Sequence, residues 1–229
     1  MNYYQHLLTQ ISVRESAVDC SRCSVDLKCC TYRPFIANFL VGGFANSETF
    51  TDELMQEWDF LILGLTPNIR YRKYFAKKGK WGFGTDATLL CTFFQKQTGQ
   101  CKIWESRPTV CRTFFCKSSY AEAGASYWNK SEEWTWLLEW ALLEDFLHHQ
   151  GWTLEEVAQA KEYLQDNAVT QNTIWPEEFF LKDREKARTF YGEAKQYVDG
   201  LDESAVMELL GVKGRQLHQE LLAEKAKLR

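Results

Sequence analysis

The stretch "CSRCSVDLKCC", residues 20–30, places four cysteines in eleven positions and ends with two of them side by side. The spacing of Cys20 and Cys23 lets one turn of backbone direct two thiolates at a single ion. The adjacent pair Cys29–Cys30 is more informative, because neighbouring side chains point about 100° apart on a helix and to opposite faces of a strand. Two such thiols rarely fit one tetrahedral ion. The pair therefore indicates two metal centres, or a ligand role for one thiol only.

A second group of cysteines, within residues 91–116, supplies the partners that these thiols need. The eight cysteines of the chain are Cys20, Cys23, Cys29, Cys30, Cys91, Cys101, Cys111 and Cys116. Eight thiolates make two four-cysteine sites, of zinc or of iron–sulfur clusters. The alternative is four ligands with four structural or reactive cysteines. A thioredoxin-like use of Cys20 and Cys23 would need a preceding strand, whereas the residues before them have helical spacing.

The composition is that of a globular protein in a reducing compartment. The chain has 229 residues, of which 45% are hydrophobic and 25% charged, so it can bury a core without disulfides. The N-terminus lacks the apolar segment of a signal peptide, and no apolar run approaches the roughly 18–20 residues that span a bilayer. We therefore predict a cytoplasmic protein with no membrane partner, in which clustered cysteines bind metal.

The first half of the chain is predicted to contain short elements. Helical spacing within residues 1–18 predicts a helix, and Pro34 with Gly42–Gly43 indicates loop or strand. Thr51 is a credible N-cap for a helix that Gly64 ends, with an apolar face. That face comprises Leu54, Met55, Trp58, Leu61 and Ile62.

Residues 70–84, "RYRKYFAKKGKWGFG", combine basic and aromatic side chains. One interpretation is a site for nucleic acid or another polyanion, since bases stack on aromatic rings while cations contact phosphates. The other is a solvated loop whose aromatic residues turn into the core. Because the net charge of the chain is −4, we favour the loop and expect no nucleic-acid partner.

Around the second cysteine group, a turn at residues 97–99 is predicted to join two extended segments. Pro108 suits the first turn of a helix that carries Thr109 to Phe115, and so Cys111. Cys111 and Cys116 are about 140° apart on a continuous helix, so this helix must end before Cys116 if both thiols face one site.

The second half of the chain is predicted to be helical. We expect a central helix over residues 131–151 closed by Gly151, a capping box at residues 153–156, a helix opened by Pro176, and one or two helices in residues 201–229. The predicted fold is mainly α, with a cysteine-ligated, metal-centred half at residues 1–125 and a helical region, residues 126–229, packed on it.

Charged and aromatic side chains flank the cysteines. Arg33, Lys102, Arg107 and Arg112 lie close in sequence and can offset the charge of about −2 that four thiolates leave on a zinc ion or a cluster; we expect Arg107 and Arg112 to support the ligands. An aromatic shell limits solvent access to a metal centre and tunes its potential. Its members are Tyr32, Phe35, Phe93, Phe94, Trp104, Phe114 and Phe115.

"CSRC…CC" followed by "CTFF" and "CKIWESRPTVCRTFFC" resembles the CxxCxxCC (YkgJ-like) family of zinc- or iron-chelating domains over residues 20–116. The second block of that family typically reads C-P-F-L, then C-x-I-Y-E-x-R-P-x-x-C-R-x-F-x-C. Trp104 stands where Tyr is usual, and five residues separate Cys23 from Cys29 where the family has two. The resemblance implies metal binding by these cysteines.

From the paired cysteines and this resemblance we predict an iron–sulfur centre with a redox, electron-transfer or sensing role. The alternatives are a structural module with one or two Zn²⁺ ions that presents the helices to a protein partner, and a metal-dependent protein-modifying enzyme. The last follows from related cysteine-rich domains in flagellin lysine methylases. The sequence names no catalytic residue, since His6, His148, His149 and His218 all lie outside the cysteine blocks.

Overall fold

A computed structural model describes residues 2–15, 28–114, 118–165 and 175–228. The fold is mainly α, as predicted. The helices are α1 Tyr3–Ile11, α2 Asn38–Gly42, α3 Leu54–Glu57, α4 Ile69–Gly82, α5 Thr109–Thr113, α6 Ala121–His149, α7 Leu154–Tyr163, α8 Arg184–Gly200 and α9 Glu203–Lys225. The strands are β1 Ile36–Ala37, β2 Trp58–Leu61, β3 Gly64–Pro67, β4 Phe94–Gln95 and β5 Gln100–Cys101.

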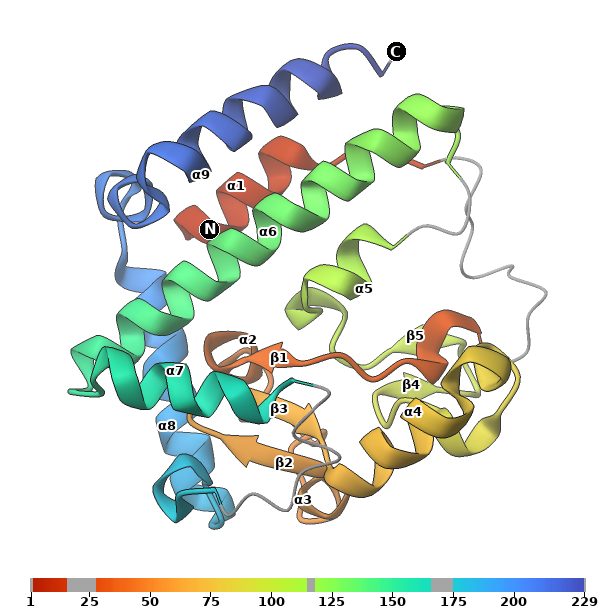
Figure 1. The fold of residues 1–229 in the computed structure, drawn as a ribbon, viewed down its shortest axis with the longest axis vertical. Helices are drawn as coiled ribbons and strands as arrows, with labels where there is room; N and C mark the ends of the chain where they lie inside the picture. Colours follow the sequence, from red (N-terminus) through yellow and green to blue (C-terminus); the bar gives the residue numbers. More distant parts are fainter. Residues whose placement is uncertain (1, 16–27, 115–117, 166–174, 229) are drawn as a thin grey trace.

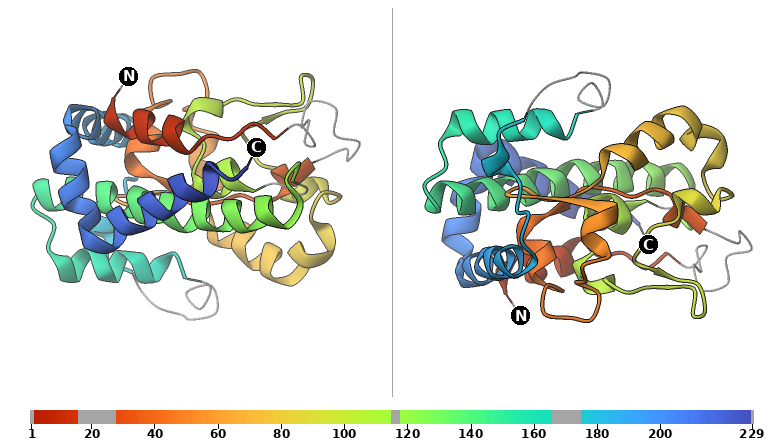
Figure 2. Two further views of the ribbon diagram at one scale, coloured as in Figure 1. Left: turned by 90° about the horizontal axis from the view of Figure 1, so that it is seen from above. Right: turned by 90° about the horizontal axis from the view of Figure 1, so that it is seen from below.

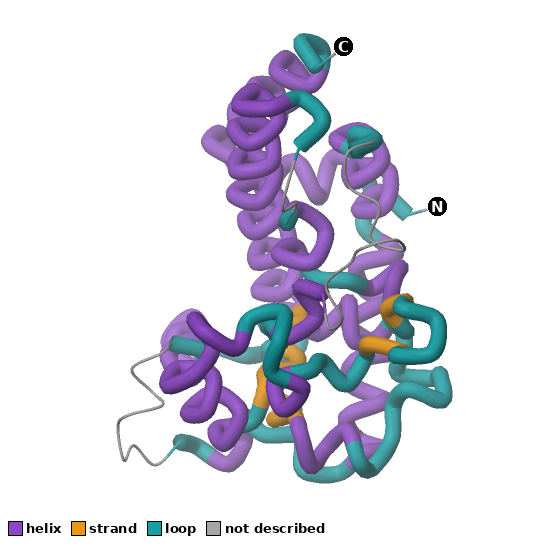
Figure 3. Tube along the Cα trace, turned by 90° about the vertical axis from the view of Figure 1, so that its right-hand side faces the viewer, coloured by secondary structure: helices purple, strands orange, loops and turns teal. Residues whose placement is uncertain are grey.

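Helix α6 is the axis of the molecule (Figure 1). Helices α9 and α1 lie along its upper side in this view, and α5 contacts it on the side that faces the small strands. Seen from above, α1 and α4 lie on opposite sides of α6 (Figure 2). The strands gather in the lower half of the molecule, below the column of helices (Figure 3). The predicted boundary after residue 125 falls inside α6, so the backbone is continuous across it.

The sheet of β1, β3 and β2 is antiparallel, with β3 in the middle, and β2 pairs with β3 from Trp58↔Pro67 to Leu61↔Gly64. Gly64 has φ +140°, and a Cβ there would lie 2.0 Å from the carbonyl oxygen of Ile36. Only glycine accepts both constraints. The buried Tyr191 of α8 donates to the carbonyl of Leu61 at 2.8 Å, which fixes α8 against the sheet.

Several predicted elements are confirmed. Helix α1 lies within residues 1–18, and Gly151, with φ +91°, follows α6. Helix α5 begins directly after Pro108 but ends at Thr113, before the predicted end at Phe115. The capping box of Thr153 and Glu156 opens α7. Strands β4 and β5 pair across the predicted turn. In the C-terminal segment α9 bends at Gly211, which fits two successive helices.

The predicted helix over residues 51–64 is wrong. Thr51 Oγ1 does accept from Leu54 N at 3.3 Å, but α3 ends at Glu57 and β2 begins at Trp58. Residues 60–67 are buried without interruption, as in a strand covered on both faces. An apolar run this short cannot be assigned to helix or strand from its periodicity alone.

The start of the third helix is also corrected. A 3₁₀ turn follows Pro176, and α8 begins only at Arg184, capped by Asp183. The intervening backbone pairs with the sheet: Ile62 N donates to the carbonyl of Phe179 at 3.0 Å, and Leu181 N donates to that of Phe60 at 2.8 Å. If residues 179–181 were helical, they could not form these hydrogen bonds with the sheet.

The loop predicted over residues 70–84 is wrong as well, since α4 covers most of it. Asn68 Oδ1 accepts from Tyr71 N at 3.0 Å and so caps the helix. Arg72 donates to the carbonyls of Tyr163 and Gln165, at 2.8 and 2.7 Å. These polar contacts help to hold the helix, together with packing of Phe75 on Tyr32.

Candidate metal centre

Five of the eight predicted ligands lie within the described residues, and none of the five forms a disulfide. They are Cys29, Cys30, Cys91, Cys101 and Cys111. Cys20, Cys23 and Cys116 lie outside the described residues, so their predicted roles stay predictions.

Backbone hydrogen bonds bring the first three of these thiols together. Cys29 and Cys30 lie on a 3₁₀ turn, Lys28–Thr31. Cys91 N donates to the carbonyl of Cys30 at 2.7 Å, which joins two segments that are far apart in sequence. The sixty residues between Cys30 and Cys91 therefore form a loop whose two ends lie side by side.

The remaining two thiols approach from separate elements. Cys101 lies in β5, opposite Phe94 of β4. Phe94 N donates to the carbonyl of Cys91 at 2.9 Å, so the hairpin starts from the Cys91 turn. Cys111 is in the middle of α5, which packs on α6. The charges of Cys91, Cys101 and Cys29 act on the thiol of Cys111, so four short pieces of backbone bring cysteines near one another.

The thiols perturb one another. Burial raises the pKa of Cys91 to about 12, and the neighbouring Cys101 adds to the shift. Burial likewise raises the pKa of Cys111, helped by Cys91, Cys101 and Cys29. The pKa of Cys30 is raised by its hydrogen bond with Cys29, then by burial. Without a cation, thiolates so close together would repel each other. Among the described residues, no three His, Cys, Asp or Glu side chains are arranged to hold an ion.

Arg33 links the segment that carries Cys29 and Cys30 to the segment that carries Cys91. Its guanidinium donates to the carbonyl of Leu90 through Nε and Nη2, at 3.0 and 2.6 Å, and forms a 2.8 Å ion pair with Glu57. The same group lies 4.5 Å from the ring centre of Tyr71. Its charge lowers the pKa of Cys91, against the effect of burial.

The two other arginines point in different directions. Arg107 Nη1 donates to the carbonyl of Cys111 at 3.2 Å, and the guanidinium lies 3.3 Å from the ring centre of Trp104. Its charge lowers the pKa values of Cys101 and Cys111. Arg112 donates to the carbonyls of Glu105 and Arg107, and its charge acts on the carboxyl of Glu139. Lys102 is exposed.

The aromatic side chains around the cysteines are buried on one side and exposed on the other. Phe93 and Phe94 are buried, and Phe35 stacks on Trp140 of α6 with ring centres 5.4 Å apart. Tyr32, Trp104 and Phe114 are 40%, 52% and 50% exposed, whereas Phe115 lies outside the described residues. The described cysteines thus have a buried side toward the core and an open side on which Cys29 is exposed.

A buried carboxyl group beside α5 is a feature that the motif search missed. Glu139 of α6 is 2% exposed. It accepts from Tyr4 OH at 3.1 Å and from Thr109 N, at the start of α5, at 3.3 Å. Burial raises its pKa to about 7, although the charge of Arg112 opposes the shift. The signal in the sequence is an acidic residue inside the apolar part of the central helix.

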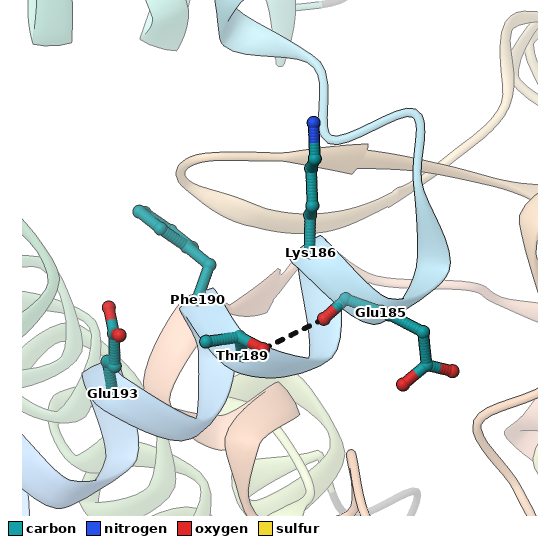
Figure 4. Close-up of a pocket in the computed structure, with 5 residues that line it drawn as sticks. All are labelled: Glu185, Lys186, Thr189, Phe190 and Glu193. Carbon is teal, nitrogen blue, oxygen red and sulfur yellow. Dashed lines mark hydrogen bonds between the residues drawn. The ribbon is translucent and has the colours of Figure 1, made fainter.

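Two hollows of the described surface lie on other elements. One, of about 440 Å³, lies between α6, α7 and α9, and its lining residues include Trp140, Glu144 and Lys161. Another follows α8 alone, where Thr189 donates to the carbonyl of Glu185 (Figure 4). Neither is lined by a cysteine. No helix of the described residues is long and apolar enough to cross a bilayer.

Comparison with protein families gives one match. Residues 19–139 match the model of the CxxCxxCC domain, described as a "putative zinc- or iron-chelating domain". This match covers more than half of the chain. The protein belongs to the CxxCxxCC family. No curated protein and no solved structure matches it. The family match begins just before Cys20 and ends at Glu139, so it includes all eight cysteines and the first part of α6.

Proposed function

We propose that this protein binds iron through its cysteines as an iron–sulfur centre and uses it in electron transfer or redox sensing. The observation that carries the proposal is the convergence of Cys29, Cys30, Cys91, Cys101 and Cys111 from four separate pieces of backbone. Thiolates are the ligands by which proteins hold iron–sulfur clusters. The zinc- or iron-chelating description of the family supports metal binding.

The number of thiols favours a cluster over one zinc ion. A structural zinc ion takes four ligands, whereas the chain has eight cysteines, five of which are free thiols within the described residues. An adjacent pair such as Cys29–Cys30 suits a centre with more than one metal atom, because one tetrahedral ion rarely accommodates both side chains.

The surroundings suit a group that exchanges electrons. Phe93 and Ile103 are buried behind the cysteines, and an apolar environment tunes the potential of a cluster. Cys29, on the other side, is exposed. A cluster supplies one-electron chemistry when it is bound. The chain contributes the thiolates and the positive charges of Arg33 and Arg107 that lower thiol pKa values.

The test is the metal and sulfide content of anaerobically purified protein, with a visible absorption spectrum and a redox titration of the same sample. We expect iron with matching sulfide and a broad visible absorption that reduction bleaches. Zinc in place of iron, or a centre that reversibly takes up no electron, would overturn the redox proposal.

Structural zinc is the second candidate, because one observation favours it. Glu139 ties the start of α5, and therefore Cys111, to the central helix. A metal at the cysteines would then hold the α5 region against α6, as structural zinc sites do. This candidate predicts colourless protein with one or two zinc ions, and a melting temperature that falls when a chelator removes them. The third alternative, a protein-modifying enzyme, gains no support from these two hollows, since neither is lined by a cysteine.

A further inference from the structure

Helix α4 carries a stripe of basic and aromatic side chains on its outer face. Helical residues are about 100° apart around the axis, so Arg70, Tyr74, Lys77 and Trp81 lie within about 60° of one another, and Lys73 and Lys78 flank them. We call these six residues the α4 stripe. All six are exposed. At 1.5 Å per residue, the stripe is about 16 Å long.

The aromatic members of the stripe face solvent, which reverses the expectation that they turn into the core. Trp81 is 82% exposed and Tyr74 38%. Within the described residues, no ring or cation lies against the Trp81 indole. Tyr74 OH donates to Asp86 at 2.8 Å, which holds the phenol ring at the surface. A tryptophan so exposed buries little apolar area, so folding alone does not account for it.

The cations of the stripe are also available. In the described parts of the chain, Arg70, Lys73, Lys77 and Lys78 form no ion pair within 4 Å. Asp86 is the acid that faces them: it accepts from Thr88 and Tyr74, and the charge of Lys78 acts on it. Residues 70–84 hold six basic and no acidic residues, while the chain has a net charge of −4. The rest of the chain therefore carries −10, and the positive charge is concentrated here.

We propose that the α4 stripe is a binding surface for single-stranded nucleic acid. Phosphates meet Arg70, Lys73, Lys77 and Lys78, and unpaired bases stack on Trp81 and Tyr74. Alternating cations and aromatic rings are what single-strand binding uses, because every base has a flat face. The spacing of about 10 Å between Tyr74 and Trp81 along the axis leaves room for a phosphate between two stacked bases.

Other partners fit the stripe less well. Its six residues include no Leu, Ile, Val or Met, whereas a membrane-surface helix and the core of a protein interface both use a broad apolar face. A duplex offers its phosphates but hides the faces of its bases, so it would leave Trp81 unused. An acidic peptide would likewise use the cations alone.

The helix is rigidly placed for this role. Tyr71 OH donates to the carbonyl of Thr31 at 3.0 Å, and Gly84 N donates to Thr31 Oγ1 at 2.6 Å. Both ends of α4 are thus fixed to Thr31, the residue after Cys30, which leaves the opposite face to the stripe. In Figures 1 and 2, α4 lies at the periphery of the molecule.

The test is fluorescence anisotropy of a dye-labelled, mixed-sequence single strand of about 12 nucleotides, titrated with the full chain. We expect Trp81→Ala to weaken binding roughly tenfold, as loss of one stacked base does, with Trp81→Phe in between. We expect Lys73→Gln with Lys77→Gln to weaken binding and to reduce the slope of log K against log salt by about 1.4.

Matched controls distinguish the α4 stripe from effects of net charge and of exposed apolar side chains elsewhere on the protein. Lys213→Gln with Lys227→Gln makes the same change of net charge at exposed positions in and after α9, and Leu154→Ala removes an exposed apolar side chain from α7. We expect both to bind as the unaltered chain does. Metal content is measured for every variant and is expected to be unchanged, so the outcome is independent of the metal proposal.

Four results would overturn the inference. They are no binding at low salt, equal binding of the duplex with the same sequence, equal binding of a polyglutamate peptide or of anionic lipid vesicles, and a Trp81→Ala variant that binds as tightly as the unaltered chain. An equal loss in the Lys213 and Lys227 control would have the same meaning, because binding would then depend on total charge.

Discussion

Helix α6 and the cysteine segments are stabilised in opposite ways. Helix α6 has 29 residues, and its buried face packs on α5, α8 and α9. The elements that carry the cysteines are a four-residue 3₁₀ turn, a two-residue strand and a five-residue helix. Elements this short bury little apolar surface and are marginal by themselves. A bound metal should therefore add more stability to the cysteine segments than to α6.

The largest expected effect tests this difference directly. Cys111→Ser should abolish most metal binding and lower the melting temperature by about 10 °C or more, because metal binding and folding are coupled. Hydrogen exchange should show faster exchange of amides in residues 91–113, with α6 and α9 still protected. Thr113→Ser, on the same helix, is the control and should keep full metal content. Equal metal content in both variants would remove Cys111 from the ligands.

The converse change removes apolar packing from the helical side. Trp134 is fully buried on α6, donates to the carbonyl of Gly214 at 3.1 Å, and stacks on His218 with ring centres 4.6 Å apart. Trp134→Ala should lower the free energy of unfolding by about 4 kcal/mol, measured by denaturant titration. Metal content per folded chain should stay unchanged. Loss of metal from this variant would mean that the two regions are one cooperative unit.

The sequence predicted elements with local signals better than elements held by distant contacts, for a physical reason. The capping box of Thr153 and Glu156 and the stop at Gly151 are local signals, and the structure has both. The β2 strand and α4 depend on distant contacts. Strand β2 is held by pairing with β3 and with residues 179–181, and α4 is held by Arg72 bonds to the end of α7. No local pattern encodes such contacts.

The candidate site shows the same division. The family follows from the spacing of the cysteines. The role of Arg33, which bonds to Leu90 and pairs with Glu57, depends on which segments meet in space. Glu139 was visible only as an acid in an apolar helix, and its partners Tyr4 and Thr109 come from distant parts of the chain.

A pH series on Glu139 tests the contact between the two regions. Burial raises its pKa to about 7, from 4.5. Between these values the folded state keeps a proton that the unfolded state has released, so this group's contribution to stability falls as pH rises. Since a shift of one pKa unit corresponds to about 1.36 kcal/mol, the free energy of unfolding falls by at most about 3 kcal/mol by pH 8.

Glu139→Gln should remove this dependence. The measurement is the difference in melting temperature between the two proteins from pH 5 to 8, at equal metal content. We expect the melting temperature of the glutamine variant to rise relative to that of the unaltered chain as pH rises. The pKa of the buried His218 is lowered by burial, which gives the opposite slope, but it is common to both proteins and cancels. A difference that does not change with pH would show that Glu139 stays ionised.

The smallest effects compare one helix cap from each region. Thr153 Oγ1 accepts from Glu156 N within α7, so the cap is local. Asn68 caps α4 through Tyr71 N and also donates to the carbonyl of Gln56 at 2.7 Å, which ties α4 to the end of α3. We expect Thr153→Ala to cost about 1 kcal/mol and Asn68→Ala up to about 2 kcal/mol, since the latter leaves an additional partner unpaired. Asn68→Asp keeps the cap but loses the donor, so in denaturant titration its stability should fall between those of the unaltered chain and Asn68→Ala. If Asn68→Asp matches the unaltered chain, the bond to Gln56 adds nothing, and α4 depends on its cap in the same way as α7.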